Sequence, residues 1–209
     1  MKKPILFFVA LCILFVSINF AARAVSFEGD ASYLLSAGGS KQRGFAAHAM
    51  IELIDHFFVD GSFLTTNSKT DSDGDNGGSA GESRSLLSVG GLYRPVNDGD
   101  LKVFVGGGFL RLTTKTGDAD PLAGQGIYGK FGFKFLPMPK LSLTADVSFA
   151  PKYQGAAANT SGSLISARAT ATYEIIAGLG LQGTIKHYRT SAASSINDTL
   201  VGGGVTFSF

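Results

Sequence analysis

Apolar and polar residues alternate one by one along most of the chain after residue 25. Between Ile127 and Phe135 the odd-numbered positions hold Ile, Gly, Phe, Phe and Phe, whereas the even-numbered positions include Tyr128, Lys130 and Lys134. Side chains two residues apart lie on the same face of a β-strand. This period therefore predicts strands with one apolar face and one polar face.

The same alternation recurs often enough to predict ten strands. The expected segments are 25–37, 45–53, 57–63, 87–94, 101–113, 127–135, 141–149, 165–175, 181–186 and 201–209. Leu34 is the one large apolar residue on the polar face of the first segment. In the segment 101–113, three consecutive glycines (Gly106 to Gly108) leave the facing undecided.

The expected connections between the strands alternate in length. Those after odd-numbered strands are long and polar (38–43, 67–85, 114–125, 154–163 and 190–198), and those after even-numbered strands are short (55–56, 95–100, 136–140 and 177–178). Outer-membrane barrels combine long extracellular loops with short periplasmic turns and an even strand number. The pattern predicts an all-β fold: a transmembrane antiparallel up-and-down β-barrel of about ten strands, with eight as the alternative, and both termini in the periplasm.

The polar face of the predicted strands carries ionisable residues of both signs. The acids are Glu28, Asp30, Glu52, Asp60, Asp146 and Glu174, and the bases are Arg94, Lys130, Lys134, Arg168 and Lys186. A soluble sandwich or lipocalin-like barrel is the alternative, and its apolar face would point into a core of large, packed side chains. Ionised groups in the interior of such a dry core would be very costly. In a membrane barrel the polar face lines the lumen and the apolar face contacts lipid, so we favour that reading.

The first residues predict export. Lys2 and Lys3 precede an apolar run from Ile5 to Phe20, which leads to Ala22-Arg23-Ala24. This is the pattern of a secretory signal peptide, so we expect a signal peptide at 1–24 and a barrel domain at 25–209. A permanent anchor is the alternative, but the run is short for a spanning helix.

The single cysteine, Cys12, lies inside this apolar run. Lipidation of Cys12 would require a small residue before it, and Leu11 stands there. The mature chain then has no cysteine, which excludes disulfides, a thiol nucleophile and a thiolate metal site. A formal net charge of +2 is too small to indicate a nucleic-acid partner.

The final segment, Val201 to Phe209, alternates apolar residues and finishes on phenylalanine. It resembles the β-signal by which bacterial outer-membrane proteins are recognised for barrel assembly, with Val205, Phe207 and Phe209 as its apolar positions. The mature chain is similar to the small outer-membrane barrels: the OmpA transmembrane domain, OmpX and the YfaZ-like proteins. The last of these is indicated by Tyr93-Arg94-Pro95 and Ser148-Phe149-Ala150-Pro151. The resemblance implies the cell outer membrane of a Gram-negative bacterium, a monomer, and contacts with lipid, lipopolysaccharide and the barrel-assembly machinery.

The nearly balanced lumen charges predict a plug. Side chains just fill a barrel of about eight strands, and porins with an aqueous channel need about 16. A narrow ion path is the alternative reading of the same residues.

One acidic segment has the spacing of a calcium loop. Asp71, Asp73, Asp75 and Glu82 occupy its first, third, fifth and twelfth positions. Asn76 stands where such loops have glycine, and a hydrophilic surface loop explains the same residues. Calcium is therefore a weak candidate, and we expect no cofactor.

The three histidines supply no catalytic arrangement. His48 is expected to face the lumen, His56 to lie in a turn and His187 to lie near the membrane interface. A lipid A deacylase of the PagL type carries a His-x-Ser pair, whereas Tyr188 and Arg189 follow His187. An omptin-like protease needs paired Asp and His at the rim, which this sequence does not supply. We expect a structural or surface-binding barrel without catalysis; a narrow passive channel or a lipid-modifying enzyme is the alternative.

Overall fold

The computed structural model describes residues 26–37, 42–68, 81–117, 119–154, 161–191 and 196–209. These residues form ten strands: β1 (Phe27–Ser36), β2 (Gln42–Ile54), β3 (Phe57–Ser68), β4 (Glu82–Asp98), β5 (Leu101–Thr116), β6 (Leu122–Met138), β7 (Leu141–Gln154), β8 (Ser161–Ile176), β9 (Leu179–Thr190) and β10 (Asn197–Ser208). The predicted number of ten is confirmed, and the alternative of eight is wrong. Within these ranges no helix has the length and apolar character needed to cross a membrane.

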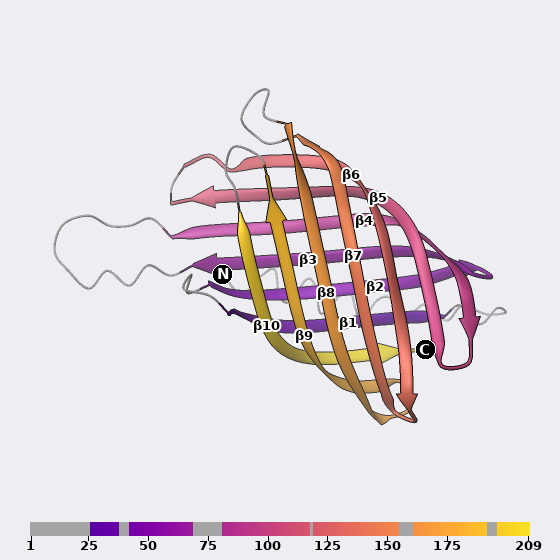
Figure 1. Cartoon of the computed structure of the whole chain (residues 1–209). Coiled ribbons are helices and arrows are strands. Elements are labelled where there is room, and N and C mark those ends of the chain that lie inside the picture. The colour runs from indigo at the N-terminus through magenta and orange to yellow at the C-terminus, as the bar shows by residue number, and fades with distance from the viewer. Residues whose placement is uncertain (1–25, 38–41, 69–80, 118, 155–160, 192–195) are drawn as a thin grey trace.

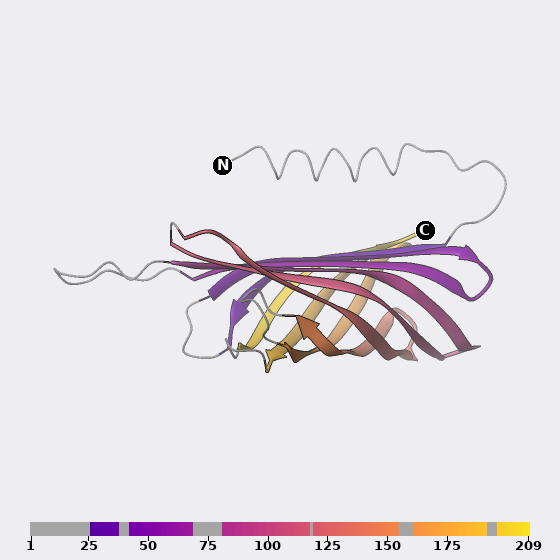
Figure 2. The ribbon, with the colours of Figure 1, turned by 90° about the horizontal axis from the view of Figure 1, so that it is seen from above.

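Each strand pairs antiparallel with its neighbours in sequence, and β1 pairs with β10, so the sheet closes into a barrel. In Figure 1, β1 to β4 run across the view and β7 to β9 run steeply in front of them. Figure 2 shows the same two walls from above. Strands of a closed barrel tilt against its axis, and strands on opposite walls therefore cross.

The two ends of the barrel differ in their connections. At one end, here named the turn end, two-residue turns join the strands at 55–56, 99–100, 139–140 and 177–178. Each of these turns holds one residue with a positive φ, for example His56 at 68° and Gly178 at 79°. Phe27 and Phe209 lie at this end as well. The other end, named the loop end, carries the longer connections, in agreement with the predicted alternation.

The strands extend further than the alternation predicted. β4 and β6 continue to Asp98 and Met138, so the connections expected at 95–100 and 136–140 are mostly strand. Pro95, Pro137 and Pro151 lie inside strands, each at a register shift. Proline cannot donate to the ladder and is accommodated at bulges. The prolines were therefore misleading as strand boundaries.

The outer face is apolar, as the alternation predicted. Large exposed side chains include Leu35, Val59, Leu87, Val89, Val105, Phe109, Ile127, Phe131, Val147, Ile165, Leu181, Ile185, Val201 and Val205. The undecided segment β5 follows the same rule, since Val105 and Phe109 point outward while Phe104 and Leu110 are buried. At the turn end, aromatic rings pack on one another, as Phe57 and Tyr93 do at 4.9 Å between centroids.

The seam between β1 and β10 closes the barrel. The backbone N–H groups of Phe27 and Phe209 donate to each other's carbonyl oxygens at 3.0 and 2.9 Å. The Phe207 ring covers Gly29 on the neighbouring strand and stacks on Phe27, with ring centroids 5.7 Å apart. The predicted pairing of the last strand with the first is confirmed, and the apolar positions of the proposed assembly signal lie along this seam.

The loop-end half of the interior is apolar. A cluster of buried side chains fills it: Leu34, Leu64, Leu86, Leu110, Leu112, Tyr128, Ala150, Tyr153, Leu164, Tyr188, Ile196 and Leu200. Leu34, the apparent exception to the alternation, belongs to this cluster and is fully buried. We name this cluster the apolar layer. It separates the charged interior described next from the loop end.

Candidate functional site

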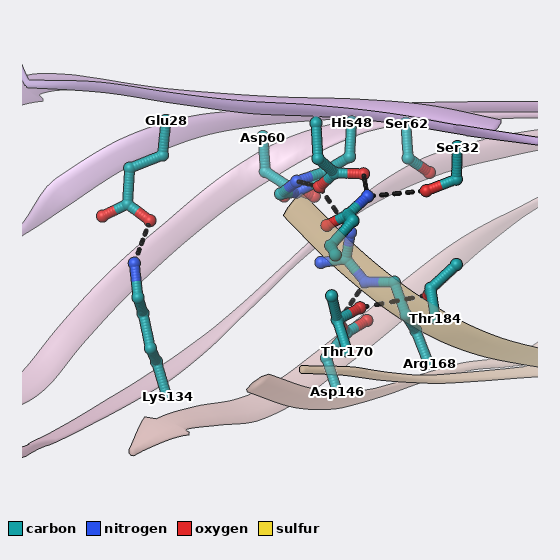
Figure 3. A network of polar contacts seen from close by, with 12 residues as sticks. Glu28, Ser32, His48, Asp60, Ser62, Lys134, Asp146, Arg168, Thr170 and Thr184 are labelled. Carbon is teal, nitrogen blue, oxygen red and sulfur yellow. Dashed lines mark hydrogen bonds and ion pairs between the residues drawn. The ribbon is translucent and has the colours of Figure 1, made fainter. Parts of the chain in front are cut away.

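Below the apolar layer lies a network of charged side chains, which we name the central network: Asp30, His48, Asp60, Lys130, Asp146 and Arg168. Its members come from six strands, β1, β2, β3, β6, β7 and β8. All occupy even-numbered positions, which face inward. Figure 3 shows His48 and Asp60 on one wall and Asp146 and Arg168 on the other.

His48 joins two carboxylates. Its Nδ1 lies 3.1 Å from Asp30 Oδ2, and its Nε2 lies 2.7 Å from Asp60 Oδ1. An ionised carboxylate only accepts hydrogen bonds, and an imidazolium donates from both ring nitrogens. A doubly protonated His48 therefore donates to both partners at once.

Two cations complete the ion pairs across the lumen. Lys130 Nζ lies 3.0 Å from both carboxylate oxygens of Asp60, which is 0% exposed. Arg168 donates from Nε to Asp146 Oδ2 at 2.8 Å and from Nη1 to Asp30 Oδ2 at 3.2 Å. The Lys130–Asp60 and Arg168–Asp30 pairs join strands that are not neighbours in the sheet, so they cross the lumen, whereas Asp146 and Arg168 are direct cross-strand partners on β7 and β8.

Neutral polar groups satisfy the remaining oxygens around the central network. Gln182 Nε2 donates to Asp30 Oδ1 at 3.2 Å and to Ser32 Oγ at 2.6 Å. The hydroxyls of Thr170 and Thr184 lie 3.1 Å apart. Buried charges are tolerated where they are paired and hydrogen-bonded, and this interior meets that condition.

The interior includes two cavities that border the central network. The smaller, about 40 Å³, lies beside the apolar layer and includes Lys186, Ser62 and Ser166 in its lining. The larger, about 180 Å³, extends from the central network to the turn end. We name the larger one the vestibule. The central network borders both cavities, and the apolar layer borders the smaller one.

The vestibule contains a second group of charges. Glu28 Oε2 accepts a hydrogen bond from Lys134 Nζ at 2.8 Å across the lumen, as Figure 3 shows, and Glu28 Oε1 lies 3.7 Å from Arg94 Nη2. The Arg94 guanidinium also lies 4.1 Å above the centroid of the Phe58 ring, in cation–π geometry. Lys102 and Lys140 belong to the same lining.

A third polar group lies at the loop end. Asp198 Oδ2 accepts from Tyr188 Oη at 3.0 Å and also pairs with Arg84. Arg84 in turn donates to both carboxylate oxygens of Glu82, from Nε at 2.9 Å and from Nη2 at 2.6 Å. This group covers the apolar layer on its outer side.

Several predicted lumen residues have other roles. Glu52 and Glu174 accept hydrogen bonds from the backbone N–H groups of His56 and Gly178 at the turns, at 3.2 and 3.1 Å. They stabilise turns and contribute nothing to the central network. Lys186 faces inward as expected, but it makes no ion pair within 4 Å among the described residues.

The two other histidines contact neutral oxygen atoms outside the central network. His56 Nδ1 lies 3.0 Å from the Arg94 carbonyl oxygen, and His187 Nδ1 lies 2.9 Å from Thr199 Oγ1 on the outer face. The described part of the chain contains no group of His, Cys, Asp and Glu suited to a metal ion. Three of the predicted calcium ligands, Asp71, Asp73 and Asp75, lie outside the described residues, as does the segment 1–24 predicted to be a signal peptide, with Cys12.

Sequence reasoning missed Lys102 and the apolar layer for the same reason. At the loop end of β5, Leu110 and Leu112 on the inner face follow Phe109 on the outer face, so both faces read as apolar. One signal could have assigned the facing of β5. The charged Lys102 stands on an even-numbered position, between the apolar Leu101 and Val103 on odd-numbered positions, so the even-numbered positions face the lumen.

Comparison with known proteins supports the fold. No protein-family model and no curated protein sequence matches the chain. The outer-membrane protease OmpT from Escherichia coli has a similar structure, with a TM-score of 0.57 and 8% identity over 90% of this chain and 99% of that one. OprG from Pseudomonas aeruginosa matches over 90% and 97% of the two chains (TM-score 0.44, 14% identity), and the N-terminal barrel domain of OprF from the same organism matches over 88% and 97% (0.41, 12%). The likeness to OmpT shows a shared barrel fold.

Proposed function

We propose that this protein is an outer-membrane barrel with an occluded lumen, which acts without catalysis as a structural element or as a scaffold for surface contacts of its loops. The observation that carries the proposal is the double barrier inside the barrel: the apolar layer and the paired central network lie one above the other. A permeation path would have to cross both barriers.

The outer face supports a membrane location. A soluble monomer rarely exposes contiguous apolar patches larger than a few hundred Å². Here the outer positions of all ten strands carry exposed apolar residues, such as Phe131 at 52% and Ile185 at 51% exposure. A lipid environment stabilises such a surface. A closed barrel also leaves no unpaired strand edge in the hydrocarbon region of the membrane.

Outward-facing arginines support an orientation. Arg43, Arg111 and Arg189 are exposed and lie in the loop-end halves of β2, β5 and β9. Arginine binds phosphate groups through paired, charge-assisted hydrogen bonds. We infer that the loop end faces the outer leaflet, where lipopolysaccharide phosphates meet these residues, and that the termini lie in the periplasm. The chain is proposed to act as a monomer delivered by the barrel-assembly machinery through Val205, Phe207 and Phe209.

Catalysis is not favoured by the arrangement of the polar residues. His48 is the histidine that contacts carboxylates, yet both its ring nitrogens are occupied by Asp30 and Asp60 in the middle of the plugged lumen. A catalytic base must be within reach of a substrate proton. The polar group at the loop end, around Asp198 and Arg84, includes no histidine among the described residues.

We predict that the refolded mature protein conducts poorly in planar lipid bilayers. The expected result is conductance near the background level, because the ion pairs and the apolar layer block the narrow interior. A trimeric porin reconstituted in the same lipid serves as the positive control. Large and stable conductance steps would overturn the proposal in favour of a channel. A changed lipid A mass spectrum in cells lacking the protein would overturn it in favour of a lipid-modifying enzyme.

A further inference from the structure

The vestibule contains more cations than carboxylates. Arg94, Lys102 and Lys134 all line it in the turn-end half of the barrel, and Glu28 contacts two of them, Lys134 and Arg94. We propose that these three cations form a binding site for a small multivalent oxyanion, such as phosphate or a phosphomonoester. The site is open toward the turn end and closed toward the loop end.

The neighbouring carboxylates are already engaged. Glu174 accepts from the Gly178 backbone, Glu52 accepts from the His56 backbone, and Asp60 is paired with Lys130 and His48. The lining of the vestibule as a whole carries six Lys and Arg side chains and four carboxylates, which leaves an excess of two positive charges (Arg94, Lys102, Lys130, Lys134, Lys140 and Arg168 against Glu28, Asp30, Asp60 and Glu174). A phosphate group carries about −1.5 to −2 at neutral pH and matches this excess.

Arg94 is held in place by its neighbours and has a hydrogen-bond donor that the described residues leave unpaired. Its side chain is 7% exposed, and stacking on Phe58 orients the guanidinium. Its Nε is buried and has no hydrogen-bond partner among the described residues, while its nearest carboxylate oxygen is 3.7 Å away. An unsatisfied buried donor is costly, and a bound oxyanion that accepted its hydrogen bonds would remove that cost.

Lys102 and Lys134 are direct cross-strand partners on β5 and β6. Like charges in directly opposite positions destabilise a sheet. Both side chains point into the vestibule, so an anion bound between them would relieve the repulsion.

Glu28 is the competitor within the site. It reaches Lys134 from the opposite wall and accepts the hydrogen bond that a ligand oxygen would otherwise accept. Its side chain remains about one-quarter exposed, as does that of Lys134. The pair is thus accessible from the vestibule, and its separation by a stronger, multivalent anion needs no movement of the backbone.

The test is isothermal titration of the refolded barrel in micelles with inorganic phosphate, in a chloride background of matched ionic strength. We expect saturable binding by the wild type. Lys102→Gln should weaken it roughly tenfold or more, because a charge-assisted contact is lost. Lys115→Gln, on the exposed loop-end part of the same strand, is the matched control and should bind as the wild type does. Glu28→Gln should strengthen binding several-fold, since it removes the competing charge.

Lys102→Gln is expected to weaken phosphate binding and Glu28→Gln to strengthen it. The test therefore still decides if one of the two variants folds poorly. Glycerol phosphate is titrated in parallel. Equal binding of both probes assigns the site to phosphomonoesters in general, and binding of phosphate alone assigns it to the free ion. Absence of saturable binding of either probe, or equal binding by the wild type and Lys102→Gln, would overturn the inference.

Discussion

At the scale of the residue, Asp60 is a buried charge whose pairing contributes to the stability of the barrel. Its carboxylate is fully buried and accepts from both Lys130 and His48. Its position in the sequence, between Val59 and Gly61, predicts only that it faces the lumen. The cost of burying this charge is offset by two partners contributed by strands β6 and β2.

We predict that Asp60→Asn destabilises the folded barrel by about 3–5 kcal/mol, because it leaves the buried ammonium of Lys130 without its closest carboxylate. The remaining acid, Asp146, is 3.9 Å away from Lys130. The measurement is urea denaturation in micelles, with the folded fraction read from gel migration without boiling. Asp60→Asn combined with Lys130→Met should recover part of the loss, and Asp120→Asn at an exposed position should change nothing. An unchanged midpoint for Asp60→Asn would mean that the pair adds little stability.

At the scale of the element, the glycine run of β10 allows the barrel to close. A Cβ atom added to Gly204 would collide with the carbonyl oxygen of Ala31 on β1, and one added to Gly202 would collide with that of Tyr33. Gly203 faces outward, and the nearest atom to its added Cβ is the Gln182 carbonyl oxygen at 3.3 Å. Figure 1 shows β10 bending as it approaches β1, and the inward-facing glycines permit this close approach.

We predict that Gly204→Ala lowers the stability of the barrel by about 1–3 kcal/mol, the usual cost of overpacking, because the added methyl group separates β10 from β1. Gly203→Ala, one residue away, is the matched control and should cost much less. The folded fraction of each variant is compared by heat-modifiable gel migration after refolding. Equal folded fractions for the two variants would contradict the role assigned to the seam.

At the scale of the whole molecule, the barrel is asymmetric along its axis. The group around Asp198 and the apolar layer lie toward the loop end, whereas the vestibule extends to the turn end. The proposed orientation places the vestibule in contact with the periplasm. Any ligand of the vestibule would then reach it from inside the cell envelope, and external solutes would meet the loop end.

We predict that an epitope inserted near Gly77, which lies outside the described residues, is bound by antibody on intact cells. The connection 69–81 belongs to the loop end, and long polar loops tolerate insertions. The control is the same epitope inserted at the Gly99–Asp100 turn, which antibody should reach only after the outer membrane is broken. The reverse result would show that the barrel is oriented the other way.

The local pattern was sufficient for the elements and for their facing. Alternation assigned Asp30, Lys130 and Arg168 to the lumen and Val205 to the outer face, because side-chain direction repeats every two residues within one strand. It failed at β5, where Gly106 to Gly108 carry no side chains and both faces near Leu110 are apolar. It also placed strand ends at Pro95 and Leu136, since it could not anticipate the bulges that accommodate Pro95 and Pro137.

By itself, the sequence determined the number of strands, their facing, the pairing of the last strand with the first and the presence of charges of both signs in the lumen. These properties depend on a two-residue period and on connection lengths, which are local. Only the tertiary structure decided that His48 bridges Asp30 and Asp60, that Lys102 lies opposite Lys134, and that Leu34 joins an apolar layer. Such partnerships depend on the register between neighbouring strands and on which strands face each other across the lumen, and closure of the barrel sets both.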